Sequence, residues 1–172
     1  LHYTAKYDNG ESFHFQIAAV GKGNLKVLNV YPSLDSLPSN ILKFYIEFSE
    51  SVGSGQAYEM INILDETGKV LPADFVNLGT ELWNKERTRL TMWLDPGRIK
   101  RDLLKNQTEG EVLEVGKKYT LFLDKRLVSI NLNSMETDYE KSFITLESDR
   151  IKPKVSEWML EWIKGKKILK GE

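Results

Sequence analysis

The chain has few histidines and no cysteine, so it is poor in the residues most often used as catalytic bases or thiol nucleophiles. Its only histidines are His2 and His14. The spacings that mark zinc proteases, serine hydrolases and P-loop NTPases do not occur. Enzymes need a positioned acid, base or nucleophile, most often a histidine. The sequence therefore predicts a protein that is not an enzyme and binds no cofactor.

Metal ligands are also sparse. His2 and His14 lie on two strands of an expected hairpin and could face each other, which would permit a weak metal site. The alternative is that they are ordinary surface or edge histidines. Calcium would need several oxygen ligands in one loop, and the nearest groupings are residues 35–36 and 65–66. Neither has the regular carboxylate spacing of a calcium loop, so we predict turn carboxylates and no metal.

A cluster of cations follows the Asp95-Pro96 turn and consists of Arg98, Lys100, Arg101 and Lys105. Such a cluster could bind a phosphate or an acidic glycan. The alternative is a solvated helix face on which Arg98 or Arg101 pairs with Asp95 or Asp102. Arg98 and Arg101 remain candidate ligand-binding residues.

Three aromatic residues form the second candidate site. The alternation of their strands predicts that Tyr45, Trp83 and Trp93 lie opposite the core residues. Exposed rings on a sheet face can stack on sugars or pack against another domain. The alternative is that at least one of them packs in the core or against a neighbouring domain.

Composition narrows the class of protein. The 172 residues include 24 basic and 25 acidic side chains, so no strong positive field for nucleic acid is expected. Hydrophobic residues make up 41% of the chain, enough for a packed core. No apolar run approaches the roughly 20 residues that span a bilayer. We expect one sizeable β domain with extra strands.

The clearest structural signal is residues 41–48, in which apolar and polar side chains alternate. This period of two predicts a strand with one buried face. Residues 30–40 contain two prolines and small polar residues, which should break any regular element before it. The same parity predicts a core built by Phe44, Ile46, Phe48, Leu90, Met92, Leu94, Leu121 and Leu123.

Short strands separated by turns recur along the rest of the chain. Hairpins are expected at 61–71 and 81–94, and further strands at 25–31, 119–124 and 140–146. Residues 57–60 could form one helical turn, 95–104 a short helix, and 105–111 a polar loop. The predicted fold class is all-β, an Ig-like antiparallel β-sandwich of about seven strands with one short helix.

Several separated motifs occur together in residues 30–33, 37–38, 43–50, 81–83, 95–101 and 116–120. With these motifs in this order, residues 25–146 resemble bacterial Ig-like domains of the S-layer type, in a subfamily of secreted, uncharacterised proteins. The chain departs from that family at 128–138, where its usual Asp-Gly-Asn turn is replaced by residues 129–134. The family implies no catalytic residues.

The resemblance also implies a domain organisation. Residues 1–24 would be a terminal hairpin that ends a preceding Ig-like repeat, with Asn9-Gly10 at its tip. Residues 25–148 would be the complete sandwich, and 149–172 a linker and the start of a following repeat. Residues 156–164 fit either a strand or a helix, and the resemblance favours the strand.

These observations lead to two functional hypotheses. The first is a structural spacer or adhesion module of a secreted, periplasmic or cell-surface bacterial protein, with neighbouring Ig-like domains or surface proteins as partners. The second is a carbohydrate-binding module that holds a glycan on Tyr45, Trp83 and Trp93.

Overall fold

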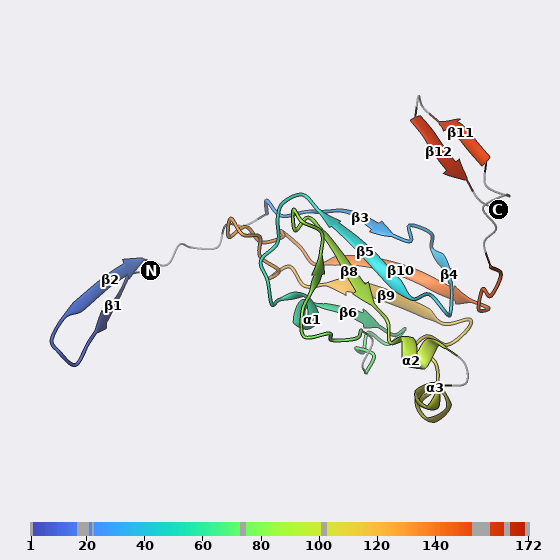
Figure 1. Cartoon of the computed structure of the whole chain (residues 1–172), viewed down its shortest axis with the longest axis horizontal. Helices are drawn as coiled ribbons and strands as arrows, with labels where there is room; N and C mark the ends of the chain where they lie inside the picture. The colour runs from blue at the N-terminus through green and yellow to red at the C-terminus, as the bar shows by residue number, and fades with distance from the viewer. Residues whose placement is uncertain are drawn as a thin grey trace.

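The structure is a computed structural model that describes residues 2–16, 21, 23–72, 75–100, 103–152, 159–163 and 166–170. Two four-stranded sheets stack face to face and form an Ig-like β-sandwich (Figure 1). The first sheet has the order β3 (Val27–Tyr31), β5 (Lys43–Phe48), β8 (Arg89–Trp93) and β7 (Leu82–Trp83). The second has the order β4 (Ser36–Pro38), β10 (Tyr139–Leu146), β9 (Lys118–Leu123) and β6 (Ile61–Leu64).

Neighbouring strands in both sheets are antiparallel, except that β4 runs parallel to β10. The chain leaves the first sheet after Tyr31 and joins the second at Ser36. We expected no regular element between residues 30 and 40, and this was wrong for 36–38. A three-residue edge strand tolerates Pro38 because its missing N–H does not break an interior ladder.

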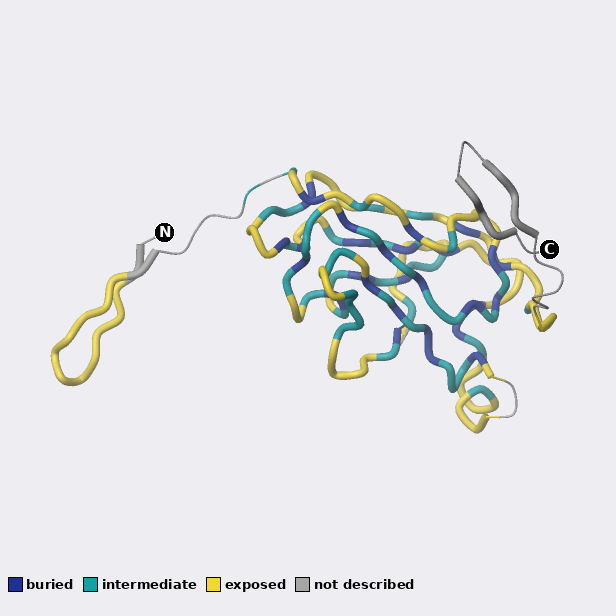
Figure 2. Tube along the Cα trace, turned by 45° about the horizontal axis from the view of Figure 1, so that its top comes forward, coloured by how far each residue is buried: buried dark blue, intermediate teal, exposed yellow. Residues whose placement is uncertain are grey.

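The core lies between the two sheets, and the eight residues predicted to build it are all at most 2% exposed. Burial alternates along the strands, as the dark and light segments of the tube show (Figure 2). Phe44 of β5 meets Phe143 of β10 across the sandwich, with ring centroids 5.6 Å apart. The alternate residues Lys43, Glu47 and Thr120 are only partly buried, so the predicted register is confirmed.

The described residues form three short helices, whereas one helical turn at 57–60, which is confirmed, and one short helix at 95–104 were expected. The three helices are α1 (Ala57–Met60), α2 (Pro96–Ile99) and α3 (Leu104–Glu109). Asp95 caps α2, because its carboxylate accepts a hydrogen bond from the Gly97 N–H at 2.8 Å and Pro96 occupies the first helical position.

The region after α2 was predicted incorrectly. Residues 105–111 were expected to be a loop, but most of them belong to α3. Ile99 is buried as its spacing suggested, whereas Leu103 and Leu104 are 44% and 76% exposed. Near-helical spacing over so few residues did not distinguish one helix from two.

A hairpin lies near each end of the chain. β1 (His2–Lys6) pairs with β2 (Ser12–Gln16), and β11 (Met159–Ile163) pairs with β12 (Lys166–Lys170). Gly10 adopts a φ of 87°, as its place at the first hairpin's tip requires. The strand expected at 156–164 is confirmed for 159–163, while 156–158 and 164 lie outside the described residues. That these hairpins are pieces of neighbouring repeats stays a prediction.

Truncating a core side chain should destabilise the sandwich strongly. We expect Phe48→Ala or Leu121→Ala to lower the free energy of unfolding by about 2–5 kcal/mol, since each leaves a cavity between packed sheets. Urea unfolding followed by circular dichroism measures this change. The control is Lys118→Ala at an exposed position of β9, which should change stability by less than about 0.5 kcal/mol. Equal effects of the core and control substitutions would contradict the assigned core.

Candidate functional site

The predicted site residues that the structure describes fall in three separate places: the outer face of the first sheet, the core side of β7, and the corner made by α2 and α3. The outer face of the first sheet is described first. Tyr45 of β5 pairs with Tyr31 of β3 on one side and with Thr91 of β8 on the other. Lys43 pairs with Trp93. Because paired residues point to the same side of a sheet, these side chains share the face opposite the core. Tyr45 and Trp93 are half-buried there, and Tyr31 is 43% exposed.

Two cations lie against the rings of this face. The Lys43 ammonium is 5.3 Å from the centroid of Tyr45 and 5.7 Å from that of Trp93. The Arg89 guanidinium carbon is 6.0 Å from the centroid of Tyr45. Contacts within about 6 Å are attractive because a ring carries partial negative charge on its faces. Sequence parity found Tyr45 and Trp93, but it missed Tyr31 because apolar and polar side chains do not alternate cleanly over residues 25–31.

Trp83 does not belong to this face, which corrects the prediction. It pairs with the fully buried Leu90 and therefore points toward the core side, where its ring packs 5.8 Å from that of Phe48. Its indole Nε1 donates a hydrogen bond to Glu81 Oε2 at 2.7 Å. The parity rule failed because β7 has only two residues, too few to establish a register.

The Glu81 carboxylate contacts three parts of the chain: Trp83 of β7, Ala57 of α1 and Arg87 in the turn before β8. It accepts a hydrogen bond from the Ala57 N–H at the start of α1, at 2.7 Å. Arg87, stacked 5.3 Å from the Trp83 ring centroid, places Nη2 3.9 Å from Glu81 Oε2. A hollow of about 480 Å³ lies beside this group and is lined also by Tyr58. Sequence reasoning missed it because the residues come from separate loops.

The Glu81 carboxyl is held in its charged form. Burial by itself disfavours the charge, but the hydrogen bonds from Trp83 and from the backbone N–H groups of Ala57, Gly55 and Gln56 outweigh that penalty. Together they lower the pKa of Glu81 below its usual value. Glu81 therefore serves as an anionic anchor for α1 and β7.

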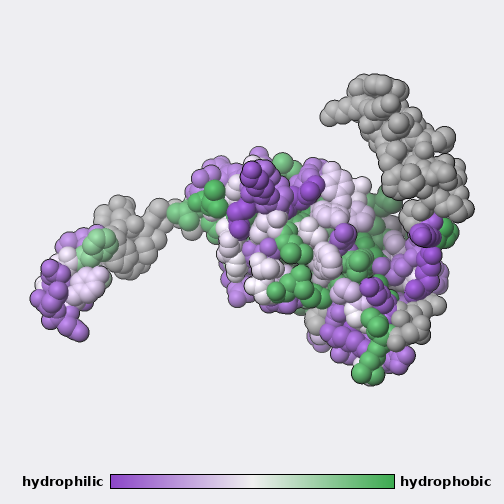
Figure 3. Space-filling view, in the orientation of Figure 1, coloured by the Kyte–Doolittle hydropathy of each residue, from purple (hydrophilic) through white to green (hydrophobic). Residues whose placement is uncertain are grey.

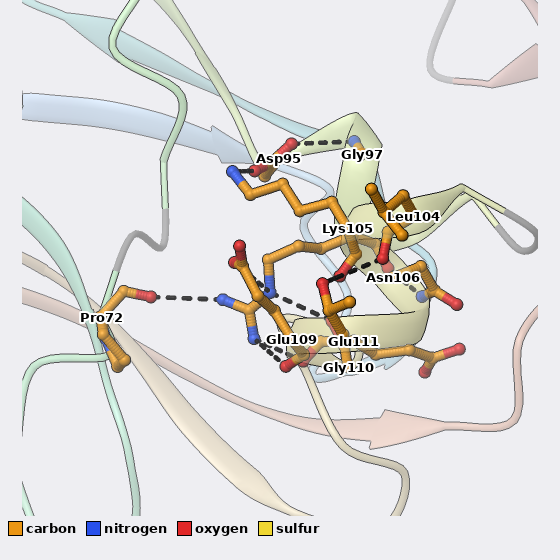
Figure 4. Close-up of polar contacts among 11 residues, drawn as sticks. Pro72, Asp95, Gly97, Leu104, Lys105, Asn106, Glu109, Gly110 and Glu111 are labelled. Atoms are coloured by element: carbon orange, nitrogen blue, oxygen red, sulfur yellow. Dashed lines mark hydrogen bonds and ion pairs between the residues drawn. The ribbon is translucent and has the colours of Figure 1, made fainter.

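The third place is the corner made by α2 and α3, and Arg98 belongs to α2. Figure 4 shows this corner, with Pro72, Asp95 and Glu109 among the labelled residues. The Arg98 guanidinium donates hydrogen bonds to the backbone carbonyls of Pro72, Glu109, Gly110 and Glu111. Only 12% of the side chain is exposed. Arg98 thus organises the corner and has little capacity left for a ligand, while Arg101 lies outside the described residues.

The neighbouring ion pair also differs from the expected one. Lys105 Nζ pairs with the Asp95 carboxylate, whereas Arg98 Nε lies 4.0 Å from Glu109 Oε2. Arg101 and Asp102 lie outside the described residues. Burial disfavours the charge of Asp95, but the hydrogen bonds from Lys105 and Gly97 dominate and lower its pKa. The cluster is therefore a structural corner, and a phosphate site built on Arg98 is not supported.

The groupings considered for metals serve local roles. His2 pairs with Gln16 in the hairpin, whereas His14 pairs with Thr4 and hydrogen-bonds its hydroxyl at 2.9 Å, so the two histidines are not directly opposite each other. Asp65 Oδ1 accepts from the backbone N–H groups of Thr67 and Lys69 and caps its own turn. Within the described ranges, no group of three histidine, aspartate or glutamate side chains could hold a metal ion.

A further set of polar contacts lies at the N-terminal end of the sandwich, where loop 129–134 binds the linker that precedes β3. The Gly21 N–H donates to the Leu132 carbonyl, and the Ser134 N–H donates back to the Gly21 carbonyl at 2.9 Å. Asn133 Nδ2 lies 3.1 and 3.0 Å from the two Glu50 carboxylate oxygens. This bond is the main cause of the lowered pKa of Glu50. A Cβ on Gly21 would lie 2.6 Å from Asn133 Oδ1, so any larger residue there would have to displace the Asn133 side chain.

The hydrogen bonds between Gly21 and loop 129–134 form one clamp on the chain, and a second clamp holds the chain after β10. Asn40 makes two hydrogen bonds to the backbone of Asp149: its Nδ2 donates to the carbonyl, at 2.5 Å, and its Oδ1 accepts from the N–H at 2.9 Å. The hydroxyls of Ser39 and Ser148 lie 2.9 Å apart beside it. The two clamps lie at opposite ends of the sandwich (Figure 1).

Comparison with known proteins places only the fold. No family model matches the chain, and no curated protein matches its sequence. One similar solved structure is the native conformation of Escherichia coli alpha-2-macroglobulin. The match covers 75% of this chain and 6% of that chain, at 15% sequence identity and a TM-score of 0.44. A crystal structure of the same protein spanning domains MG0-NIE-MG1 matches at 17% identity, over 75% of this chain and 33% of that chain, with a TM-score of 0.43.

CopC from Methylosinus trichosporium OB3b also matches, at 20% identity over 75% of this chain and 99% of that chain, with a TM-score of 0.43. The two macroglobulin chains are much longer than the part that this chain covers. The resemblance to Ig-like domains of the S-layer type stays a prediction.

Replacing the anionic anchor should cost stability in a pH-dependent way. Because folding lowers the pKa of Glu81, the unfolded chain takes up its proton first as the pH falls. The stabilisation is complete above the unfolded pKa of about 4.3 and is lost as the pH falls through the lower folded value. Glu81→Gln should thus lower the free energy of unfolding by about 1–3 kcal/mol at neutral pH and by much less at about pH 3.

Urea unfolding at the two pH values measures this difference. The matched control is Glu59→Gln on α1, an exposed carboxylate near the same site. A constant Glu81→Gln effect at both pH values would show that packing, and not charge, is what the substitution removes.

Proposed function

We propose that this protein is a non-enzymatic Ig-like spacer module of a secreted or surface bacterial protein, which fixes the directions of the segments that precede and follow it. The observation that carries the proposal is the pair of clamps. The linker at Gly21 and the chain at Asp149 are each held to the sandwich by hydrogen bonds, at opposite ends. A spacer needs rigid attachments of this kind, because otherwise neighbouring domains move independently.

The distribution of polar groups also supports a role without catalysis. The described carboxylates with lowered pKa values cap turns, pair with cations or hold loops: Glu50, Asp65, Glu81, Asp95 and Asp124. Catalytic sites instead bring perturbed groups together in one cleft. Here they are spread over separate loops, each with its own partners. This distribution favours a structural role for each of these carboxylates.

We also propose an extracytoplasmic location, in line with the resemblance to secreted Ig-like domains. None of the helices in the described ranges has the length and apolar character needed to cross a bilayer. The partners proposed for the module are neighbouring Ig-like domains or surface proteins. The rival hypothesis of a carbohydrate platform made of Tyr45, Trp83 and Trp93 loses one of its three rings, because Trp83 packs against Phe48.

Loosening one clamp should free its linker without unfolding the sandwich. Asn40→Ala removes both hydrogen bonds to Asp149, so the Asp149 amide should lose its protection from hydrogen exchange. Core amides should keep theirs, and the free energy of unfolding should fall by no more than about 2 kcal/mol. Hydrogen exchange of individual amides, followed by NMR, measures the protection of the Asp149 amide and of the core amides.

The control is Asn62→Ala on β6, an asparagine whose one assigned side-chain hydrogen bond goes to the Glu59 carbonyl and not to a linker. Gly21→Ala tests the other clamp, because the added Cβ displaces Asn133 and should release the Gly21 amide. If the Asp149 amide exchanges equally fast in the wild type and in Asn40→Ala, the C-terminal linker is not held as we propose.

The sandwich should also fold without its terminal hairpins. A chain of residues 21–152 keeps both clamps and the whole core, so it should unfold cooperatively and sediment as a monomer. Comparison with the full chain by sedimentation shows whether the hairpins cause association, as two-stranded hairpins with apolar residues often do. Loss of cooperative unfolding in the shorter chain would mean that the hairpins belong to one larger domain.

A further inference from the structure

The outer face of the first sheet has features that the spacer role does not use. Tyr31, Tyr45 and Trp93 come from three adjacent strands and project to the same side. A solvent-facing sheet surface of a spacer would ordinarily carry small or charged polar residues. In the orientation of Figure 3, polar, weakly polar and apolar side chains are mixed in small patches over the visible face of the sandwich.

The cations of this face lack ionic partners. Among the residues that the structure describes, no carboxylate lies within ion-pair distance of Lys43 or Arg89. Glu47 is paired with Arg89 in the ladder, yet its Oε2 accepts a hydrogen bond from Asn29 at 2.9 Å. Lys43 and Arg89 lie against the rings instead. The face thus presents two cations, Lys43 and Arg89, that form no ion pair with a described carboxylate, and one carboxylate, Glu47, that is bonded to Asn29.

We propose that this face binds an acidic polysaccharide, with its sugar rings on Tyr31, Tyr45 and Trp93 and its carboxylate or sulfate groups on Lys43 and Arg89. Aromatic rings offer flat apolar surfaces to the C–H faces of sugars, while tyrosine hydroxyls remain available for hydrogen bonds. Arginine and lysine supply charge-assisted hydrogen bonds to oxyanions.

Charge complementarity selects an acidic polysaccharide over the other occupants. A neutral glycan would leave Lys43 and Arg89 unused. Nucleic acid binding depends on many phosphate contacts, which two cations on a chain of net charge −1 do not provide. A second copy of the same face would bring the unpaired cations close together, which is unfavourable. A carboxylated or sulfated sugar chain fits both the rings and the charges.

Affinity electrophoresis of the full chain tests the proposal with polygalacturonate, dextran sulfate and neutral dextran in the gel. We expect polygalacturonate, dextran sulfate or both to retard the chain, and dextran not to. Retardation by only one of the acidic polymers identifies the charged group as carboxylate or sulfate. The double variant Lys43→Gln/Arg89→Gln should bind about tenfold more weakly, from the loss of two charge-assisted contacts.

Tyr31→Ser tests the rings separately, because Tyr31 is exposed on an edge strand and its replacement should leave the core packed. It too should weaken binding. The control is Lys118→Gln, an exposed cation of the second sheet, which should leave binding unchanged. Circular dichroism and thermal unfolding verify that each variant is folded.

Three results would overturn the proposal: no retardation by either acidic polymer, equal retardation by dextran, or equal weakening in Lys118→Gln. A dimer in the absence of polysaccharide that dissociates in Lys43→Gln/Arg89→Gln would also overturn it, because a second copy would then cover the face. None of these results bears on the clamps at Gly21 and Asp149, so the spacer function stands or falls separately.

Discussion

Burial of the Phe44 ring between the two sheets is the interaction on which the remaining arrangement depends. The ring is inaccessible to solvent and meets Phe143 of the opposite sheet and Phe75 of the loop before β7. A slip of β5 by one residue would expose it and bury Lys43 and Tyr45 in its place. The packing of one aromatic ring thus sets which side chains of β5 reach the outer face. The core therefore positions the cations and the aromatic rings of the outer face.

The ends of the sandwich are held by a different kind of interaction from its centre. Apolar packing holds the sheets together, whereas hydrogen bonds join the linkers to the sandwich: backbone groups of loop 129–134 hold Gly21, and the Asn40 side chain holds the backbone of Asp149. Hydrogen bonds are directional, so they define an angle as well as a distance. Loop 129–134 is the loop that holds Gly21.

The sequence was most informative where one local pattern decided the structure. Alternation over residues 41–48 was sufficient to assign β5 and the core, because burial of one sheet face leaves a strand few other registers. Asn9-Gly10 likewise located a hairpin tip.

The amino-acid sequence was least informative where contacts join residues that are far apart in the chain. Asn40 and Asp149 are 109 residues apart, and Arg98 finds its carbonyl partners at Pro72 and at residues 109–111. Trp83 was misplaced because a two-residue strand has no period of its own, and Tyr31 was missed because apolar and polar side chains do not alternate cleanly over residues 25–31. The candidate face could be assembled only when the register of three strands was known.

The parallel pairing of β4 with β10 has a mechanical consequence. β4 lies near the beginning of the sandwich and β10 at its end, and the two run side by side in the same direction. Tension applied between the two linkers would pull these strands past each other lengthwise. The hydrogen bonds from Ile144 N–H to the Asp35 carbonyl and from Ser39 N–H to the Leu146 carbonyl would then bear the load together, in shear, instead of opening one after another as in a pulled hairpin. A module joined in this way resists stretching along its length.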